Sequence, residues 1–194
     1  MSASPKGNLI VISGPSGVGK SSIIDAVLDG TRSEFSVSAT TRQPRRGETD
    51  GVDYHFITRE GFLDAIASGQ VLEWAEYGGN LYGTPRAPVE DAIRRGNSVI
   101  LDIENDGAKQ VRQAFPRAVL IFITPPNLEE LEKRLRGRGD TADADVEKRL
   151  AVASQQIAEA PSVYNHIVEN RGLDAAITQI LDILSLPSAV TRRM

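Results

Sequence analysis

Short apolar runs alternate along the chain with stretches whose apolar positions recur every three or four residues. The runs are nearly continuous in hydrophobicity, as strands of a parallel sheet covered on both faces must be. They predict strands at Leu9–Ser13, Ser98–Asp102, Val119–Thr124 and residues 166–170. The helical spacing predicts helices at residues 21–28, 87–95, 106–114, 128–136, 144–160 and 173–184. This alternation predicts an α/β fold with a central parallel sheet.

The alternation breaks between about residues 36 and 85. There the chain reads YHFI, then a helical REGFLDAIASG, then VLEWAEYGGNLYG, with turn residues between these segments. We therefore expect a mixed α/β lobe of residues 38–86, inserted into a core formed by residues 1–37 and 87–194. Trp74 and the apolar residues of FLDAI are expected to form the small hydrophobic core of this lobe.

The composition is that of an ordinary globular protein. The chain has 194 residues, of which 40% are hydrophobic and 25% charged, and these values exclude disordered and fibrous classes. It has no cysteine, which excludes disulfides, thiolate nucleophiles and sulfur-bound zinc and fits a reducing compartment. No apolar run long enough for a signal peptide or a membrane span follows MSASPKG. We expect a cytoplasmic protein with no membrane partner.

A glycine-rich stretch, GPSGVGKS, lies between the first predicted strand and the first predicted helix. It matches the pattern G-x-x-x-x-G-K-[ST], whose glycines let backbone N–H groups turn toward phosphate oxygens while the helix adds its positive end. The lysine neutralises the β and γ phosphates, and the last serine offers a hydroxyl to Mg²⁺. The predicted triphosphate site consists of Gly14, Pro15, Ser16, Gly17, Val18, Gly19, Lys20 and Ser21.

Asp102 ends the predicted strand SVILD. An acid in this position can support Mg²⁺ through its hydration shell. It can equally cap the next helix, and the residues alone leave both interpretations open.

The positive charge is concentrated in two segments, TTRQPRRGE and EKRLRGRGD. With a formal net charge of −4, the chain lacks the global positive field that recruits nucleic acid, so we expect no nucleic-acid partner. Isolated basic clusters are more often solvated loops. Beside a triphosphate site, however, both become candidates for holding phosphate groups.

Four segments together resemble the guanylate kinase family: SATTRQPRRGETDGVDYHF, EWAEYGGNLYGTP, ILDIENDGA and RLRGRGD. The resemblance runs from about residue 8 to residue 170, with the motifs in the family's order. It implies a phosphate-loop kinase with an inserted monophosphate lobe and a short lid at about residues 137–149. The implied reaction is the Mg²⁺-dependent transfer of phosphate from ATP to GMP, with dGMP as a poorer substrate.

The resemblance also assigns the GMP phosphate. A dianionic phosphate needs guanidinium forks and hydroxyl donors. Arg42 and Arg45 offer the forks, and Tyr54 and Tyr82 offer the hydroxyls. The GMP set also includes Glu48 and Asp102. The alternative is that the arginines are solvated and the tyrosines only pack.

Guanine presents N1–H and N2–H₂ donors side by side, and a carboxylate can accept both, whereas adenine would leave that charge unpaired. Glu73 matches the family's guanine-binding glutamate. Ser38 and Thr84 match hydroxyl positions that face the base, and Thr84 stands where relatives often carry serine. Taken alone, Glu73 would read as a surface residue.

For catalysis, the resemblance implies Lys20 at the donor phosphates and Arg138 and Arg149 as lid arginines that close over them. Asn170 is implied at the ATP adenine. Two departures stand out: LDIENDG has Glu104 and Asp106 where the family has aspartate and glutamine, and Arg171 replaces an acid. We expect activity to survive both.

Three alternatives remain at this level. Domains that resemble guanylate kinases can bind phosphopeptides without catalysis, but usually with degraded phosphate loops. A kinase of another small molecule would lack the set that reads guanine, and a nucleic-acid ATPase would need an extended basic face. The residues do not decide between a monomer and a homodimer.

Overall fold

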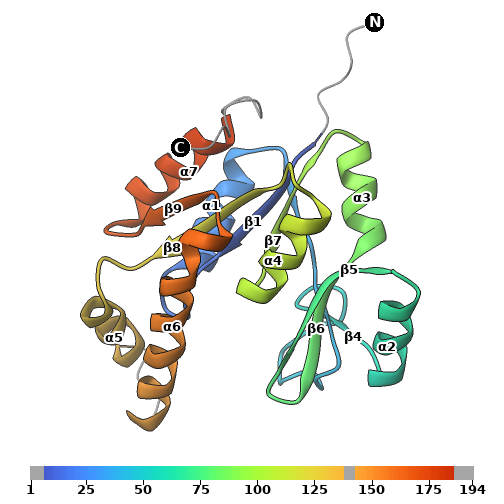
Figure 1. Cartoon of the computed structure of the whole chain (residues 1–194), viewed down its shortest axis with the longest axis horizontal. Helices are drawn as coiled ribbons and strands as arrows, with labels where there is room; N and C mark the ends of the chain where they lie inside the picture. Colours follow the sequence, from blue (N-terminus) through green and yellow to red (C-terminus); the bar gives the residue numbers. More distant parts are fainter. Residues whose placement is uncertain (1–6, 138–142, 186–194) are drawn as a thin grey trace, which may run out of the picture.

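The computed structural model describes residues 7–137 and 143–185. At its centre lies a five-stranded parallel sheet with the strand order β2-β7-β1-β8-β9 (Figure 1). Its strands are β1 (Leu9–Ser13), β2 (Ser33–Phe35), β7 (Ser98–Asp102), β8 (Val119–Thr124) and β9 (His166–Glu169). The chain leaves β1 for one edge of the sheet and later returns to the other side, and ligands of such sheets bind at the carboxyl ends around this reversal.

The side chains of β1 alternate between two hydrophobic cores. Leu9 and Val11 belong to the core that includes α3 (Arg86–Arg94), α4 (Asn105–Ala114) and the end of α6 (Asp143–Val163). Ile10 and Ile12 belong to the core with α1 (Lys20–Gly30) and α7 (Leu173–Ser185). Because both faces are covered, every position of β1 is buried, and this explains the unbroken apolar run.

A second sheet lies to one side of the core (Figure 1). It has four strands in the order β4-β3-β6-β5, namely β3 (Ala39–Thr40), β4 (His55–Phe56), β5 (Val71–Tyr77) and β6 (Asn80–Pro85). Helix α2 (Arg59–Ala67) covers it, and the two share a small core of Ala39, Phe62 and Leu81. The hairpin β5–β6 approaches α4, so this sheet, which we call the lobe, faces the carboxyl ends of the central strands.

The fold class is confirmed, and most predicted elements fall within a few residues of the observed ones. Helix α5 (Leu128–Arg136) packs against α6 through Leu131 and Leu135, and its bounds are those predicted. Helix α6 is longer than predicted and continues past Pro161. Strand β2 was missed because its three residues, SEF, lie at the sheet edge and carry no apolar run.

The prediction that Trp74 belongs to the lobe core is wrong. Its side chain is 39% exposed, whereas the preceding Leu72 and Glu73 are both buried. The pairing of β5 with β6 shifts register between Val71 and Trp74. Such a bulge breaks the regular alternation of side chains, so two consecutive residues can be buried and the next one exposed.

Candidate active site

The loop between β1 and α1 is shaped by its glycines. Gly17 and Gly19 have φ values of +86° and +93°, which other residues rarely adopt. A Cβ on Gly14 would lie 2.4 Å from the carbonyl oxygen of Ile123 in β8. The loop therefore takes this form only with these glycines. It borders a cavity of about 280 Å³ lined by Gly14, Pro15, Ser16, Gly17, Gly19, Lys20, Ser21, Ser22 and Glu104.

Helix α1 begins at Lys20, so its N-terminal end adjoins this cavity. Its cap residue, Gly19, makes no side-chain hydrogen bond to the helix, and the first turn contains no acid. The partial positive charge of the helix end is thus uncompensated by these usual groups and is available to an anion.

Lys20 is held by the neighbouring strand. Its Nζ lies 2.6 Å from Oδ1 of Asp102 and 3.5 Å from the carbonyl oxygen of Gly14. The register of β1 and β7, in which Ile12 stands opposite Asp102, brings the loop and this carboxylate together. Asp102 therefore balances the lysine charge at the edge of the phosphate loop.

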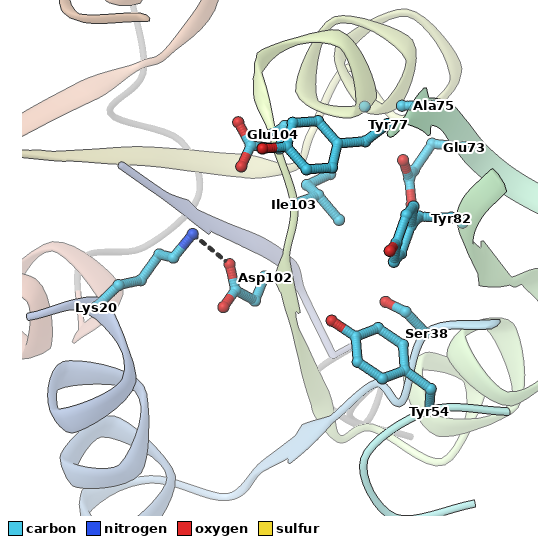
Figure 2. Close-up of a pocket in the computed structure, with 12 residues that line it drawn as sticks. Lys20, Ser38, Tyr54, Glu73, Ala75, Tyr77, Tyr82, Asp102, Ile103 and Glu104 are labelled. Carbon is cyan, nitrogen blue, oxygen red and sulfur yellow. Dashed lines mark ion pairs between the residues drawn. The ribbon is translucent and has the colours of Figure 1, made fainter. Parts of the chain in front are cut away.

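A second cavity, of about 340 Å³, connects this ion pair to the lobe. Figure 2 shows Lys20 and Asp102 on the side of the core, with Ser38, Tyr54 and the hairpin residues Glu73 and Tyr82 across from them. The complete lining also includes Ala75, Tyr77, Gly83, Ile103, Glu104 and Gly107. One cavity is thus lined at one end by the lysine of the glycine-rich loop and at the other by the Glu73 carboxylate.

Glu73 is a buried carboxylate, with 3% of its surface exposed. Its Oε1 accepts a hydrogen bond of 2.6 Å from the hydroxyl of Thr84 on β6. Burial raises the pKa of Glu73, and the bonds from Thr84 only partly oppose this. No described cation forms an ion pair with it, so a ligand that donates hydrogen bonds would relieve the cost of its burial.

Arg42 is fixed in position by Glu48. Its two terminal nitrogens donate to the two carboxylate oxygens, both at 2.9 Å, and the backbone N–H of Arg45 donates to Glu48 at 2.6 Å. These bonds lower the pKa of Glu48 to about 2. The Arg42 guanidinium lies 5.3 Å from the ring centre of Tyr54, whose ring meets that of Tyr82 edge-on. A charged fork and two phenols are thereby held together.

The family model described as guanylate kinase matches residues 6–186. The chain belongs to the guanylate kinase family. It is 48% identical to a guanylate kinase of Synechocystis sp. over 93% of this chain and 95% of that protein. It is 47% identical to the guanylate kinase of Bacillus subtilis over 92% and 88% of the two chains.

A solved structure agrees with this family. The crystal structure of guanylate kinase from Anaplasma phagocytophilum is similar with a TM-score of 0.75 and 34% identity, covering 93% of this chain and 85% of that one. The family resemblance seen in the sequence is therefore confirmed, and the chain is an enzyme of the nucleoside monophosphate kinase class.

The structure brings six of the predicted site residues to the second cavity: Lys20, Ser38, Tyr54, Glu73, Tyr82 and Asp102. Thr84 is buried and is not one of the lining residues, and its hydroxyl donates to Glu73. Arg42 and Glu48 lie beside Tyr54, and the side chain of Arg45 is exposed. The individual roles of these residues stay predictions.

The residues predicted for the lid and the ATP base are less clustered. Arg138 lies outside the described residues, and Arg149 is exposed on α6. Gly137 ends α5 in the right-handed helical region, with φ −66°, so here it is an ordinary helix end. Asn170 is buried; its Nδ2 donates to the Val18 carbonyl at 2.8 Å, and within the described chain its Oδ1 has no hydrogen-bond partner.

Sequence reasoning missed Gly107 and Tyr77, which line the second cavity, and left Glu104 in doubt. Glu104 lines both cavities and accepts a hydrogen bond from Gln156 of α6. Burial raises the pKa of Glu104, with Lys20 opposing. Asp106 instead pairs with Lys109 at 3.0 Å and lines neither cavity. In the sequence, Gly107 could be noticed only as the glycine that follows Glu104 and Asp106 in the motif LDIENDG.

Among residues 7–137 and 143–185, no helix has the length and apolar character needed to cross a bilayer. The same residues contain no cluster of three or more histidine, cysteine or acidic side chains that could hold a metal ion.

Proposed function

We propose that this chain transfers the γ-phosphoryl group of ATP to GMP, giving ADP and GDP. The observation that carries this proposal is the continuity of the site. The lysine of the phosphate loop and the buried Glu73 line one cavity. Family membership supports the same reaction, since the relatives named above are guanylate kinases.

ATP binds with its phosphates against the loop formed by residues 14–21. The loop N–H groups and the start of α1 receive the β and γ phosphates, and Lys20 exchanges Asp102 for the γ phosphate. Asn170 offers a buried acceptor, Oδ1, beside the loop and is proposed to face the nucleotide. These contacts fix the donor phosphate at the carboxyl end of β1.

GMP binds in the lobe half of the cavity. The carboxylate of Glu73 accepts N1–H and N2–H₂ of guanine, and Ser38 donates to the base. Arg42, set by Glu48, and the hydroxyls of Tyr54 and Tyr82 hold the phosphate, with Arg45 closing from the surface. The groups that read base and phosphate do not require the 2′-hydroxyl, so we propose dGMP as a second, poorer substrate.

Transfer requires alignment of the acceptor oxygen with the γ phosphorus and stabilisation of the charge that develops there. Lys20 provides the fixed positive charge on the donor side. Arg138 and Arg149 are proposed to move over the phosphates when both nucleotides are bound and to exclude water that would hydrolyse ATP. No residue of the chain forms a covalent intermediate.

The residues fit Mg²⁺ carried by the nucleotide. Ser21 presents an exposed hydroxyl at the loop cavity, and Asp102 and Glu104 supply carboxylates nearby. A magnesium ion of this kind takes few protein ligands and most of its oxygens from phosphates and water, which agrees with the lack of a metal-binding cluster in the described chain. Bound with ATP, Mg²⁺ supplies neutralisation of the phosphate charge.

The test is ADP formation by the purified protein with ATP, Mg²⁺ and each of GMP, AMP, CMP and UMP. We expect turnover with GMP and less than about 1% of that rate with the other monophosphates. Lys20→Met and Glu73→Gln should each abolish most of the activity, whereas Gln113→Ala, an exposed change on α4, should not. A folded protein that phosphorylates no monophosphate would contradict the proposal and favour a phosphopeptide-binding role.

A further inference from the structure

Helix α4 lies against the strand that carries Glu73, and it contacts that strand at two consecutive residues. We infer that α4 positions the Glu73 carboxylate for guanine, through the missing side chain of Gly107 and the amide of Gln110. Both are positioning residues, since they act through Glu73. The inference rests on the proposed function above and assigns it two further specificity-determining residues.

Gly107 leaves the space that the carboxylate occupies. A Cβ at this position would lie 2.3 Å from Oε2 of Glu73 and 3.1 Å from its Cδ. Gly107 is helical and its φ is not positive, so its backbone would accept alanine without strain. The Cβ would also lie 3.3 Å from Cδ1 of Ile103, a tight contact but far less severe than the one with Glu73. Glycine is a poor helix former, and the space for Glu73 is the main requirement for it in the described structure.

The atoms that would have to give way are the ends of side chains: the Glu73 carboxylate by a large shift and Cδ1 of Ile103 by a small one. The fold can therefore accept a methyl group at residue 107, provided that the Glu73 carboxylate leaves its place. That place is defined by the hydrogen bond of 2.6 Å from Thr84 to Oε1, with Oε2 turned toward Gly107. A substitution here displaces the group that reads guanine and leaves the rest of the structure intact.

Gln110 holds the backbone next to Glu73. Its Nε2 donates to the Trp74 carbonyl at 2.7 Å, and its Oε1 accepts the Trp74 N–H at 3.2 Å. Strand β5 is an edge strand of the lobe sheet, and an edge strand offers unpaired backbone groups to a neighbour. The side-chain amide of Gln110 thus bonds both backbone groups of Trp74, as a neighbouring strand would, and links β5 to α4.

The two contacts belong to one device. Gly107 and Gln110 are three residues apart and lie on the same face of α4. They meet Glu73, within the irregular stretch of β5, and Trp74, where regular pairing with β6 resumes. Pairing with β6 is regular from Trp74 onward, so within the irregular stretch before it the contacts of α4 add to the hold that the sheet has on the strand. The position of the carboxylate is therefore set by the core and not by the lobe alone.

The first test compares Gly107→Ala with Gly30→Ala, a helical glycine at the far end of α1 whose Cβ would make only ordinary contacts from 3.4 Å. Gly107→Ala should raise KM for GMP about tenfold or more while KM for ATP changes less than about twofold and the melting temperature is not lowered. Gly30→Ala should change neither KM. An unchanged KM for GMP in Gly107→Ala would overturn the inference.

A rescue separates displacement of Glu73 from a general structural defect. Glu73→Asp shortens the side chain by one methylene and frees the space beside residue 107. Because both changes then act on one carboxylate, the double variant Gly107→Ala/Glu73→Asp should bind GMP no worse than Glu73→Asp alone. Losses that multiply in the double variant would contradict the inference.

Gln110→Glu keeps the shape and the acceptor but removes the donor to the Trp74 carbonyl. It should raise KM for GMP several-fold at pH 7, whereas Gln113→Ala on the same helix should not; equal KM values would overturn the role of Gln110 even if Gly107→Ala failed to fold. GMP phosphorylation by the wild-type protein is measured first. If the wild-type protein does not phosphorylate GMP, the proposed function itself fails, independently of the variants.

Discussion

The phosphate loop and the lobe present different kinds of groups to the proposed nucleotides. The loop presents its backbone: glycines with positive φ and a helix start with no acid in its first turn. The lobe presents side chains, each held by a partner, as Arg42 is by Glu48 and Glu73 is by Thr84. The loop therefore depends on backbone geometry and the lobe on side chains held by hydrogen-bonded partners, and substitutions in the two should have different effects.

The largest effect is expected where both halves meet. Lys20→Met removes the fixed positive charge at the donor phosphates, and we expect kcat to fall by roughly 10²–10³-fold. The protein should stay folded, because both Lys20 and Asp102 line an open cavity and water can solvate the Asp102 carboxylate when the lysine is lost. Steady-state rates and thermal melts measure the two effects. A variant with near-normal kcat would place the donor phosphates elsewhere.

Glu73→Gln tests the side-chain half. Glutamine cannot accept both guanine donors, so kcat/KM for GMP should fall about 100-fold. The free energy of unfolding of Glu73→Gln, in contrast, should not fall at neutral pH. Because burial raises the pKa of Glu73, the folded state holds its proton more tightly than the unfolded chain, and stability falls as pH rises through that pKa.

Glutamine does not ionise, so Glu73→Gln does not lose stability as the pH rises. At pH 7 it should be at least as stable as the wild type, by up to about 1 kcal/mol, and the difference should vanish below about pH 4. Chemical unfolding at both pH values measures it. A variant that is less stable at pH 7 than at pH 4, relative to wild type, would show that the carboxylate stabilises the fold.

Gly14→Ala tests the backbone half and should lose activity and stability together. The new Cβ would meet the backbone oxygen of Ile123, which cannot move aside as a side chain can. We expect a loss of roughly 1–3 kcal/mol and an increase in KM for ATP of about tenfold. Gly30→Ala is the matched control. Loss of ATP binding without loss of stability would mean that the loop is less constrained than its geometry indicates.

The smallest effect is expected for Glu48→Gln, which frees Arg42 from its carboxylate. KM for GMP should rise about threefold to tenfold with kcat little changed, since the fork remains but is no longer oriented. The pair should persist to acid pH, because the pKa of Glu48 is about 2. Glu76→Gln, which breaks an exposed ion pair with Arg59 in the same lobe, is the control and should leave KM unchanged.

The contrast also explains what could be predicted from the sequence. A site made by the backbone leaves a contiguous pattern, and residues 14–21 could be predicted to bind phosphate from that pattern alone, without comparison with a family. The strands of the central sheet could also be predicted, because strands buried on both faces are apolar at nearly every position. The lobe sites are scattered over residues 38–84, and only their resemblance to a family joined Ser38, Arg42 and Glu73 in advance.

What the sequence could not show are supports that depend on packing. The register shift in β5 exposes Trp74 and buries Glu73, and no periodicity predicts it. The clearance at Gly107 exists only because α4 meets β5, two elements that are distant in the sequence. Thr84 was predicted to face the base, and its hydrogen bond to Glu73 could not be foreseen from the sequence. Short polar edge strands such as β2 carry too little pattern to be found.

The most direct test of the account is the ratio of kcat/KM for GMP to that for IMP, measured in the wild type and in Glu73→Gln. IMP lacks the N2 amino group and keeps N1–H and O6, so it reports on one of the two hydrogen bonds assigned to Glu73. We predict a ratio of about tenfold or more in the wild type and a ratio near one in Glu73→Gln. The same ratio in both proteins would contradict the claim that the buried carboxylate reads guanine.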